Sequence, residues 1–281
     1  MSNIVSMVGL YKTYGILKKN KILENLELSI DKNTCVAIVG PNGIGKSTLL
    51  KIISGIICYD SGSVRVEDIV GYCPEVSVGF DFMTGKQNLD YFINMGISGT
   101  EETDYLSMLN LDSGTKRFGS FSKGMKRKLD IARALSMGAN VLIMDEPFDG
   151  LDPISSNDFV GIINKLKDIG KTIIISSHDL NKVERVAEKI YFLKNGVLNE
   201  SSQIQEQILY VDFEGDASKM EDAFKIIGYT ILKKDGIRYY FRNSENIKIS
   251  KIILTLLSSG LEIVGFGNES LENFYVRAAN E

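Results

Sequence analysis

The sequence is poor in cysteine and has no long apolar run. No stretch of about 18 consecutive apolar residues occurs in the 281 residues, so no transmembrane helix is expected. The first residues, Met1 to Val5, do not combine a basic region with an apolar block, and no signal peptide is expected either. The three cysteines, Cys35, Cys58 and Cys73, lack C-x-x-C spacing, which predicts buried, reduced thiols and excludes a disulfide framework or a cysteine zinc site.

The chain also lacks an excess of positive charge. Its formal net charge is −4, whereas nucleic-acid binding depends on clustered Lys and Arg. Lys126, Arg127 and Lys128 form one basic run, which we interpret as the solvent-exposed face of a helix. Hydrophobic residues make up 44% of the chain, enough for a sizeable core. The length predicts one large domain and one small domain.

A glycine-rich stretch dominates the N-terminal half. The apolar run 35–39 predicts a buried strand, and residues 47–53 can continue as a helix. Between them lies a segment that fits the pattern G-x-x-x-x-G-K-[ST]. Its residues are Gly40, Pro41, Asn42, Gly43, Ile44, Gly45, Lys46, Ser47 and Thr48.

This pattern has a direct chemical meaning. Glycines let successive backbone N–H groups point at one phosphate, and the N-terminus of the following helix adds a positive dipole there. Lys46 is expected to reach the β- and γ-phosphates, and the Ser47 hydroxyl to bind Mg²⁺. The sequence therefore predicts binding of a nucleoside triphosphate.

Two further buried strands end in polar residues that suit the same site. The run 141–144 leads directly into Asp145 and Glu146, and the run 172–176 leads into Ser177 and His178. Parallel α/β sheets place their ligands at the carboxyl ends of the strands. We expect Asp145 to hold Mg²⁺, Glu146 to polarise an attacking water, and His178, the single histidine, to face the phosphates.

Three other features have two interpretations each. Tyr14 is either a base-stacking aromatic or a half-buried strand residue, with Tyr11 as its competitor. Glu75 follows a strand end and either faces a metal or water, or is a solvated loop acid. Phe80 and Phe82 belong either to core packing or to a docking surface.

The chain divides into two patterns. Ser122 predicts the N-cap of a strong helix, and the polar stretch 199–203 predicts a linker. We expect an α/β P-loop domain over 1–204, with a β-rich N-terminal part and a helical subdomain at about 76–136. Residues 205–281 follow the order β-α-β-β-α-β, with helices at 216–227, 246–258 and 269–278, which predicts a small ferredoxin-like domain.

The motifs together resemble the nucleotide-binding subunit of an ATP-binding cassette (ABC) transporter, over residues 1 to about 200. Besides the phosphate loop and the strand ending in Glu146, the segment 149–152 resembles the family's D-loop and His178 its switch histidine. Tyr14 matches the adenine-stacking aromatic. The family signature, usually L-S-G-G-Q, corresponds to Ser122, Lys123, Gly124 and Met125.

Three positions depart from the commonest family pattern. Glu75 replaces a glutamine that senses Mg²⁺ and the membrane partner, Lys123 replaces the second signature residue, and Met125 replaces a glutamine. These departures are similar to the exporter-type, ABC-2-like branch, as are the segments 83–89 and 269–274. Glu75 adds negative charge beside the triphosphate.

The resemblance implies a mechanism and partners. Two cassettes, identical or different, would close around ATP and Mg²⁺, with each signature facing the other chain's γ-phosphate. Hydrolysis, with Lys46, Glu146 and His178 as catalytic residues, would drive a separate transmembrane permease. The chain would then lie in the cytoplasm, on the inner face of the membrane, without a nucleic-acid partner.

Two alternatives come from other classes. One is a soluble ABC-type ATPase acting on DNA or ribosomes, but the chain has neither the long coiled-coil insertion nor the second cassette of such proteins. The other is a regulatory module that binds ATP without turnover, which the presence of Glu146 argues against.

Overall fold

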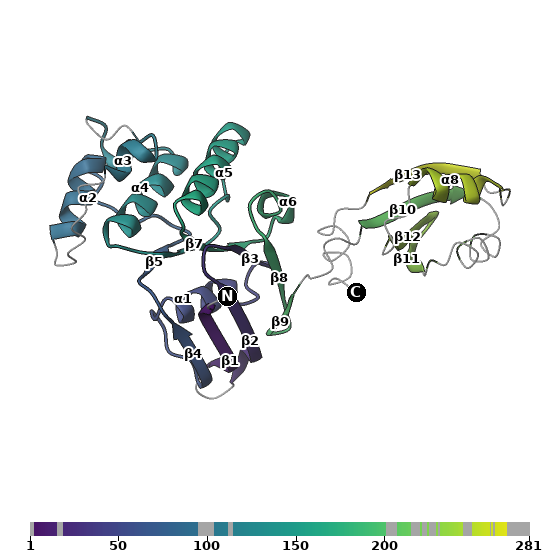
Figure 1. The fold of residues 1–281 in the computed structure, drawn as a ribbon, viewed down its shortest axis with the longest axis horizontal. Helices are drawn as coiled ribbons and strands as arrows, with labels where there is room; N and C mark the ends of the chain where they lie inside the picture. Colours follow the sequence, from purple (N-terminus) through teal and green to yellow (C-terminus); the bar gives the residue numbers. More distant parts are fainter. Residues whose placement is uncertain are drawn as a thin grey trace. The chain divides into compact units, whose positions relative to one another are not determined.

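A computed structural model of the chain divides it into two compact units, Met1–Ser201 and Ser202–Glu281 (Figure 1). The boundary expected at 204/205 stays a prediction. Among the helices described, none combines the length and apolar character needed to cross a bilayer. The structure describes residues 3–15, 19–94, 104–111, 115–200, 207–214, 231–243, 249–258 and 262–268, and the single residues 220, 224, 229 and 260.

A six-stranded sheet forms the centre of the first unit, in the order β5-β6-β7-β3-β8-β9. All of its neighbouring pairs are parallel except β8 with β9. Every residue of β3, β6 and β7 is buried, as expected for central parallel strands covered on both faces. The strands are β3 (Cys35–Val39), β5 (Val70–Cys73), β6 (Val141–Met144), β7 (Thr172–Ser177), β8 (Lys189–Lys194) and β9 (Val197–Glu200).

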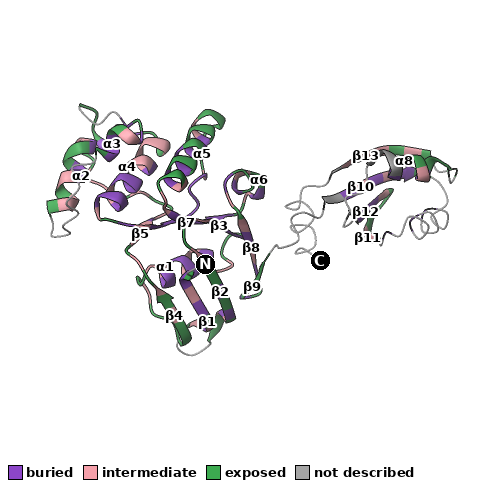
Figure 2. Ribbon diagram, in the orientation of Figure 1, coloured by how far each residue is buried: buried purple, intermediate pink, exposed green. Residues whose placement is uncertain are grey.

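A second, antiparallel sheet lies at the N-terminus, in the order β2-β1-β4. One continuous core joins this sheet to the helix after β3 and to the inner residues of the six-stranded sheet. Burial in Figure 2 follows this arrangement, with buried residues on β3 and β7 and exposed ones on the outer faces of the helices. The elements are β1 (Asn3–Tyr14), β2 (Asn20–Asp31), β4 (Ser61–Val66) and helix α1 (Lys46–Ile53).

The remaining helices of the first unit follow local signals in the sequence. Asp152 caps α5 by accepting hydrogen bonds from the amides of Ile154 and Ser155, and Pro153 occupies the first helical position. Ser122 caps α4 by accepting from the amide of Met125, which confirms the predicted N-cap. The helices are α2 (Gly85–Asn94), α3 (Tyr105–Met108), α4 (Lys123–Ser136), α5 (Pro153–Asp168) and α6 (Leu180–Val183), with a 3₁₀ turn at Phe118–Ser120.

The second unit contains a four-stranded antiparallel sheet in the order β11-β12-β10-β13. This strand order is the one that the ferredoxin-like β-α-β-β-α-β pattern produces, and it confirms the predicted class. Of the helices expected in this unit, the one at 216–227 lies outside the described residues except for Met220 and Phe224, and the one at 269–278 lies wholly outside them. The elements are β10 (Gln207–Glu214), β11 (Ile231–Asp235), β12 (Arg238–Asn243), α8 (Ile249–Ser258) and β13 (Glu262–Asn268).

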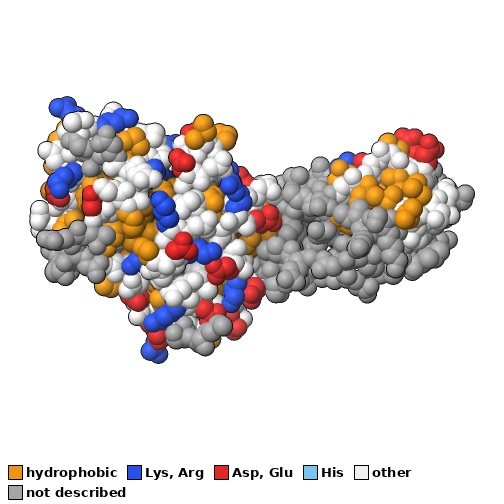
Figure 3. Space-filling view, turned by 45° about the horizontal axis from the view of Figure 1, so that its top comes forward, with side chains coloured by type: hydrophobic (Ala, Val, Ile, Leu, Met, Phe, Trp, Pro, Cys, Tyr) orange, Lys and Arg blue, Asp and Glu red, His pale blue; other side chains and the backbone are white. Residues whose placement is uncertain are grey.

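The core of the second unit is separate from that of the first. Phe241 is fully buried at its centre, where its ring contacts the rings of Phe224, Tyr229 and Phe266. Apolar side chains also remain on the surface of this unit, where an orange area is visible in Figure 3. They include Leu254, Leu257 and Val264.

The structure corrects three predictions. Asn199 and Glu200 belong to β9, so the expected linker cannot begin before residue 201. Cys58 is exposed, although Cys35 and Cys73 are buried as predicted. Burial raises the pKa of the Cys35 thiol to about 12. Arg127 is buried and does not lie on a solvated face; its contacts are described below.

Candidate functional site

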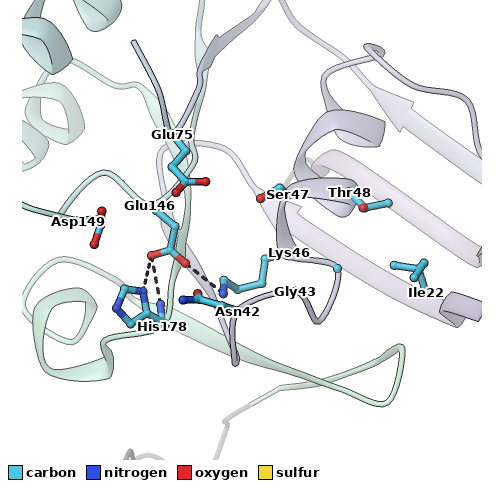
Figure 4. A pocket seen from close by; sticks show the side chains of 11 residues that line it. Ile22, Asn42, Gly43, Lys46, Ser47, Thr48, Glu75, Glu146, Asp149 and His178 are labelled. Carbon is cyan, nitrogen blue, oxygen red and sulfur yellow. Dashed lines mark hydrogen bonds and ion pairs between the residues drawn. The ribbon is translucent and has the colours of Figure 1, made fainter.

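The predicted phosphate loop, which follows β3, and the first residues of α1 form one wall of a cavity of about 410 Å³. Gly43 and Gly45 have φ angles of 79° and 116°, which glycine adopts without strain. A Cβ at Gly45 would lie 2.7 Å from Ile22 Cγ2, so any larger residue at this position would also clash with Ile22. The lining residues are Ile22, Asn42, Gly43, Gly45, Lys46, Ser47, Thr48, Glu75, Glu146, Asp149 and His178 (Figure 4).

Lys46 is a buried cation at the first position of α1. Its ammonium group donates hydrogen bonds to the carbonyls of Gly40 at 2.7 Å and Pro41 at 3.1 Å. It also lies 3.0 Å from Glu146 Oε1. The Lys46 and Glu146 side chains are only 4% and 9% exposed, so this ion pair is shielded from water and each charge needs a partner.

Glu146 connects Lys46 to His178. Its second carboxylate oxygen, Oε2, lies 3.0 Å from His178 Nδ1 and accepts from the His178 amide at 3.3 Å (Figure 4). A carboxylate only accepts hydrogen bonds, so this contact is a hydrogen bond in the histidine tautomer that has its proton on Nδ1. The end of β6 and the end of β7 therefore meet at the phosphate loop, as the strand-end argument predicted.

Asp145 lies behind the cavity and contacts Ser47. Its Oδ1 accepts hydrogen bonds from Ser47 Oγ at 3.1 Å and from Ser176 Oγ at 2.6 Å. Its Oδ2 accepts from the Tyr72 hydroxyl at 3.0 Å. Burial and the neighbouring Asp145 carboxylate raise the pKa of Tyr72, which keeps the hydroxyl protonated as a donor.

The oxygen atoms at this position suit Mg²⁺ bound together with a triphosphate. A hydroxyl and a carboxylate, Ser47 and Asp145, are hard ligands of the kind that Mg²⁺ prefers. Within the described ranges, no three His, Cys, Asp or Glu side chains gather closely enough to hold a metal by themselves.

Not every predicted site residue lines this cavity. Gly40, Pro41 and Ile44 belong to the loop but are not among its lining residues, and Tyr14, 46% exposed at the end of β1, is not either. The same holds for the four signature residues Ser122, Lys123, Gly124 and Met125, at the start of α4. Lys123 Nζ instead lies 3.7 Å from Asp149 Oδ2, between two exposed side chains.

Three residues of the site were not predicted, and a fourth, Asp149, was expected only as part of the D-loop. Ile22 and Asp149 line the cavity. Ser176 accepts from the Glu146 amide at 2.8 Å while donating to Asp145, and Tyr72 donates to Asp145. The available signal was position, since Ser176 ends the predicted strand 172–176 and Tyr72 lies shortly before Glu75, which follows a strand end.

Fold and cavity together define a P-loop nucleoside triphosphatase. A family model described as ABC transporter matches residues 23–149. The chain is 36% identical over 204 residues to the lantibiotic transport ATP-binding protein SrtF of Streptococcus pyogenes, covering 69% of this chain and 88% of that protein. It is also 29% identical to the bacitracin transport ATP-binding protein BcrA of Bacillus licheniformis, over 99% of this chain and 97% of that protein.

A solved structure shares the fold of the first unit. It is a dimeric ATP-binding cassette in a post-hydrolysis state with ADP and phosphate bound, with a TM-score of 0.63 and 24% identity. It covers 70% of this chain and 97% of its own. The chain belongs to the family of ABC transporter ATP-binding proteins, which are ATPases. The alternative of an ATPase acting on nucleic acids or ribosomes has no support among these relatives.

Proposed function

We propose that this chain hydrolyses ATP as one half of a cassette dimer that powers an exporter, through a separate membrane permease. One observation carries the proposal: the Glu146 carboxylate lies between Lys46 and His178 at the mouth of the phosphate loop. A base next to a phosphate-binding cation is the arrangement that in-line attack by water requires. The names of SrtF and BcrA favour a peptide antibiotic as the exported cargo.

Each side chain at the site has a separate role in this proposal. Lys46 leaves Glu146 and binds the β- and γ-phosphates, while Glu146 orients the attacking water and accepts its proton. His178 holds Glu146 and faces the γ-phosphate. When Mg²⁺ is bound, Ser47 and Asp145 would hold it, with Glu75 beside it, and the ion would supply positive charge to the phosphate oxygens. Tyr14 stacks on the adenine.

The signature residues complete the site from the second chain. The N-terminus of α4, with Ser122 to Met125, offers amides and a positive dipole that attract a phosphate. A two-fold axis would place this end against the partner's γ-phosphate and so close both sites at once. ATP then holds the two chains together, and hydrolysis releases them.

Sizing by light scattering with and without MgATP tests this function, on the original chain and on Glu146→Gln. The substitution removes both the base and the charge that competes for Lys46. We expect the original chain to hydrolyse ATP and the variant to form a stable ATP-dependent dimer. A variant that binds ATP yet stays monomeric even with a permease present would contradict the dimer mechanism.

The segment 75–84 is our proposed docking surface for the permease. Val76, Val78 and Phe82 are 76%, 59% and 67% exposed, an apolar group that water disfavours. Phe80 is half-buried, and its ring centroid lies 4.7 Å from that of Tyr91, so Phe80 packs against α2 beneath the exposed apolar side chains.

Because Phe80 is part of this packing, Phe82→Asp is the cleaner test. We expect it to abolish co-purification with the permease and to leave ATP binding unchanged. Tyr59→Asp, at a partly exposed aromatic outside this surface, is the control. Retention of the permease by the Phe82 variant would place the docking surface elsewhere.

A further inference from the structure

The buried guanidinium of Arg127 joins the two backbone segments that carry Glu75 and Glu146. Arg127 lies on the second turn of α4 and is 5% exposed. Its Nη1 donates to the carbonyl of Pro74, the residue before Glu75. Its Nη2 donates to the carbonyl of Glu146 at 3.2 Å. One side chain therefore satisfies two main-chain acceptors from different loops.

The backbone of Glu146 needs such support. Its φ angle is 46°, a left-handed conformation that is uncommon for a residue with a side chain. The amide of Glu146 donates to Ser176 Oγ, and its carbonyl accepts from Arg127. Held at both ends, the residue directs its carboxylate toward Lys46 and His178.

We propose that Arg127 is a positioning residue for hydrolysis, which holds the backbone of Glu146 in its left-handed conformation and ties it to Pro74. The inference rests on the proposed role of Glu146. Arg127 is not among the residues that line the cavity, so it acts through Glu146 and not on the phosphates. Because the same guanidinium binds both carbonyls, a displacement of the Pro74–Glu75 segment would also move the backbone of Glu146.

Steady-state ATP turnover by the full-length chain tests the proposal, with Arg127→Met, Arg127→Gln and Arg127→Lys. Misplacing a catalytic group by about 1 Å can cost about a hundredfold in rate, so we expect kcat to fall at least about tenfold. The KM for ATP should change less than about threefold, because the phosphate loop is untouched. Lys128→Met removes a cation from the next position of α4 and should leave both constants unchanged.

A second measurement separates positioning from general damage. Single-turnover hydrolysis is compared between Glu146→Gln and the double variant that also carries Arg127→Met. If Arg127 acts through Glu146, the second substitution should change the remaining rate by less than about twofold, since residues acting as one unit are not additive. The proposal would be overturned if Arg127→Met lowered the rate of the Glu146→Gln variant by the same factor as that of the original chain. An unchanged kcat in the single Arg127 variants would overturn it as well.

The outcomes distinguish this inference from the proposed function. Absence of hydrolysis by the original chain would contradict the proposed function itself. Normal hydrolysis together with normal turnover by the Arg127 variants would contradict only the positioning role. If Arg127→Met does not fold, the Lys and Gln variants, which keep a donor at this position, decide the question.

Discussion

Ser176 links the two acids that end β6. Its hydroxyl donates to Asp145 and accepts from the amide of Glu146, and the residue is fully buried. One small side chain thereby sets the distance between the proposed Mg²⁺ ligand and the proposed base. The backbone of β7 holds Ser176 rigidly, which suits a residue that orients others.

Ser176→Ala should lower both stability and turnover. The substitution leaves the Glu146 amide and one Asp145 contact unsatisfied in a buried place, at a cost of about 1–3 kcal/mol in the free energy of unfolding. Urea denaturation and steady-state ATP hydrolysis measure the two effects. Thr172→Val is the control, because Thr172 is a buried hydroxyl at the opposite end of β7. It should lose stability without losing kcat, and equal losses of kcat would contradict the role of Ser176.

At the residue scale, sequence reasoning identified the acids but not their partners. Asp145, Glu146 and His178 follow apolar runs, and the structure brings these three to the same edge of one sheet. Ser176 lies inside such a run, and its role depends on β6 and β7 being neighbours in a particular register. Pairing of strands far apart in the sequence is not encoded in local hydrophobic periodicity.

Among the secondary-structure elements, α4 has the largest influence on the site. It begins at the signature residues, carries Arg127, and packs closely on β5. Gly71 on β5 permits this approach: a Cβ there would lie 2.4 Å from the Cβ of Ala134. The position of the signature therefore depends on a glycine in a different element.

Gly71→Val should push α4 away from β5. Overpacking of this kind costs about 1–3 kcal/mol, and it should also weaken ATP-dependent dimerisation in the Glu146→Gln background. The urea midpoint and light scattering report the two effects. Gly161→Ala on α5 is the control, because nothing lies within 4 Å of a Cβ at that position. A Gly71 variant with normal stability and dimerisation would show that the helix position is not critical.

The sequence predicted α4 and its cap but misjudged one of its faces. Leu129, Ala132 and Leu135, at helical spacing along α4, are buried. Arg127 and Asp130 are buried as well, because the segment 74–78 crosses this part of the helix. A charged residue is expected to be exposed unless its partners are known. The partners of Arg127 are backbone carbonyls about 20 to 50 positions away in the chain, and Asp130 accepts a hydrogen bond from Arg133 on the same helix.

At the scale of the whole molecule, each of the two units has its own hydrophobic core, and the cavity lies in the first unit. Every residue that lines the cavity belongs to the first unit. The second unit has its own core around Phe241. The strand order of the second unit was predictable because each of its elements pairs within about 60 residues of chain.

Phe241→Ala should therefore destabilise the second unit without affecting nucleotide binding. Loss of a fully buried phenylalanine costs about 3–5 kcal/mol. Calorimetry of the full chain should show a lower unfolding temperature for one transition, while the KM for ATP stays unchanged. Leu254→Ala, an exposed position of the same unit, should change neither. A raised KM in the Phe241 variant would mean that the second unit contributes to nucleotide binding.

The location of the signature outside the chain's own cavity has a consequence for reaction order. If each site is completed only by a second chain, the active species is an encounter complex. At low protein concentration, the hydrolysis rate should then rise with the square of that concentration, and specific activity should vanish on dilution. A permease that holds two cassettes side by side would replace this dependence with a fixed local concentration. The assembled transporter should therefore hydrolyse ATP at dilutions where the isolated chain is inactive.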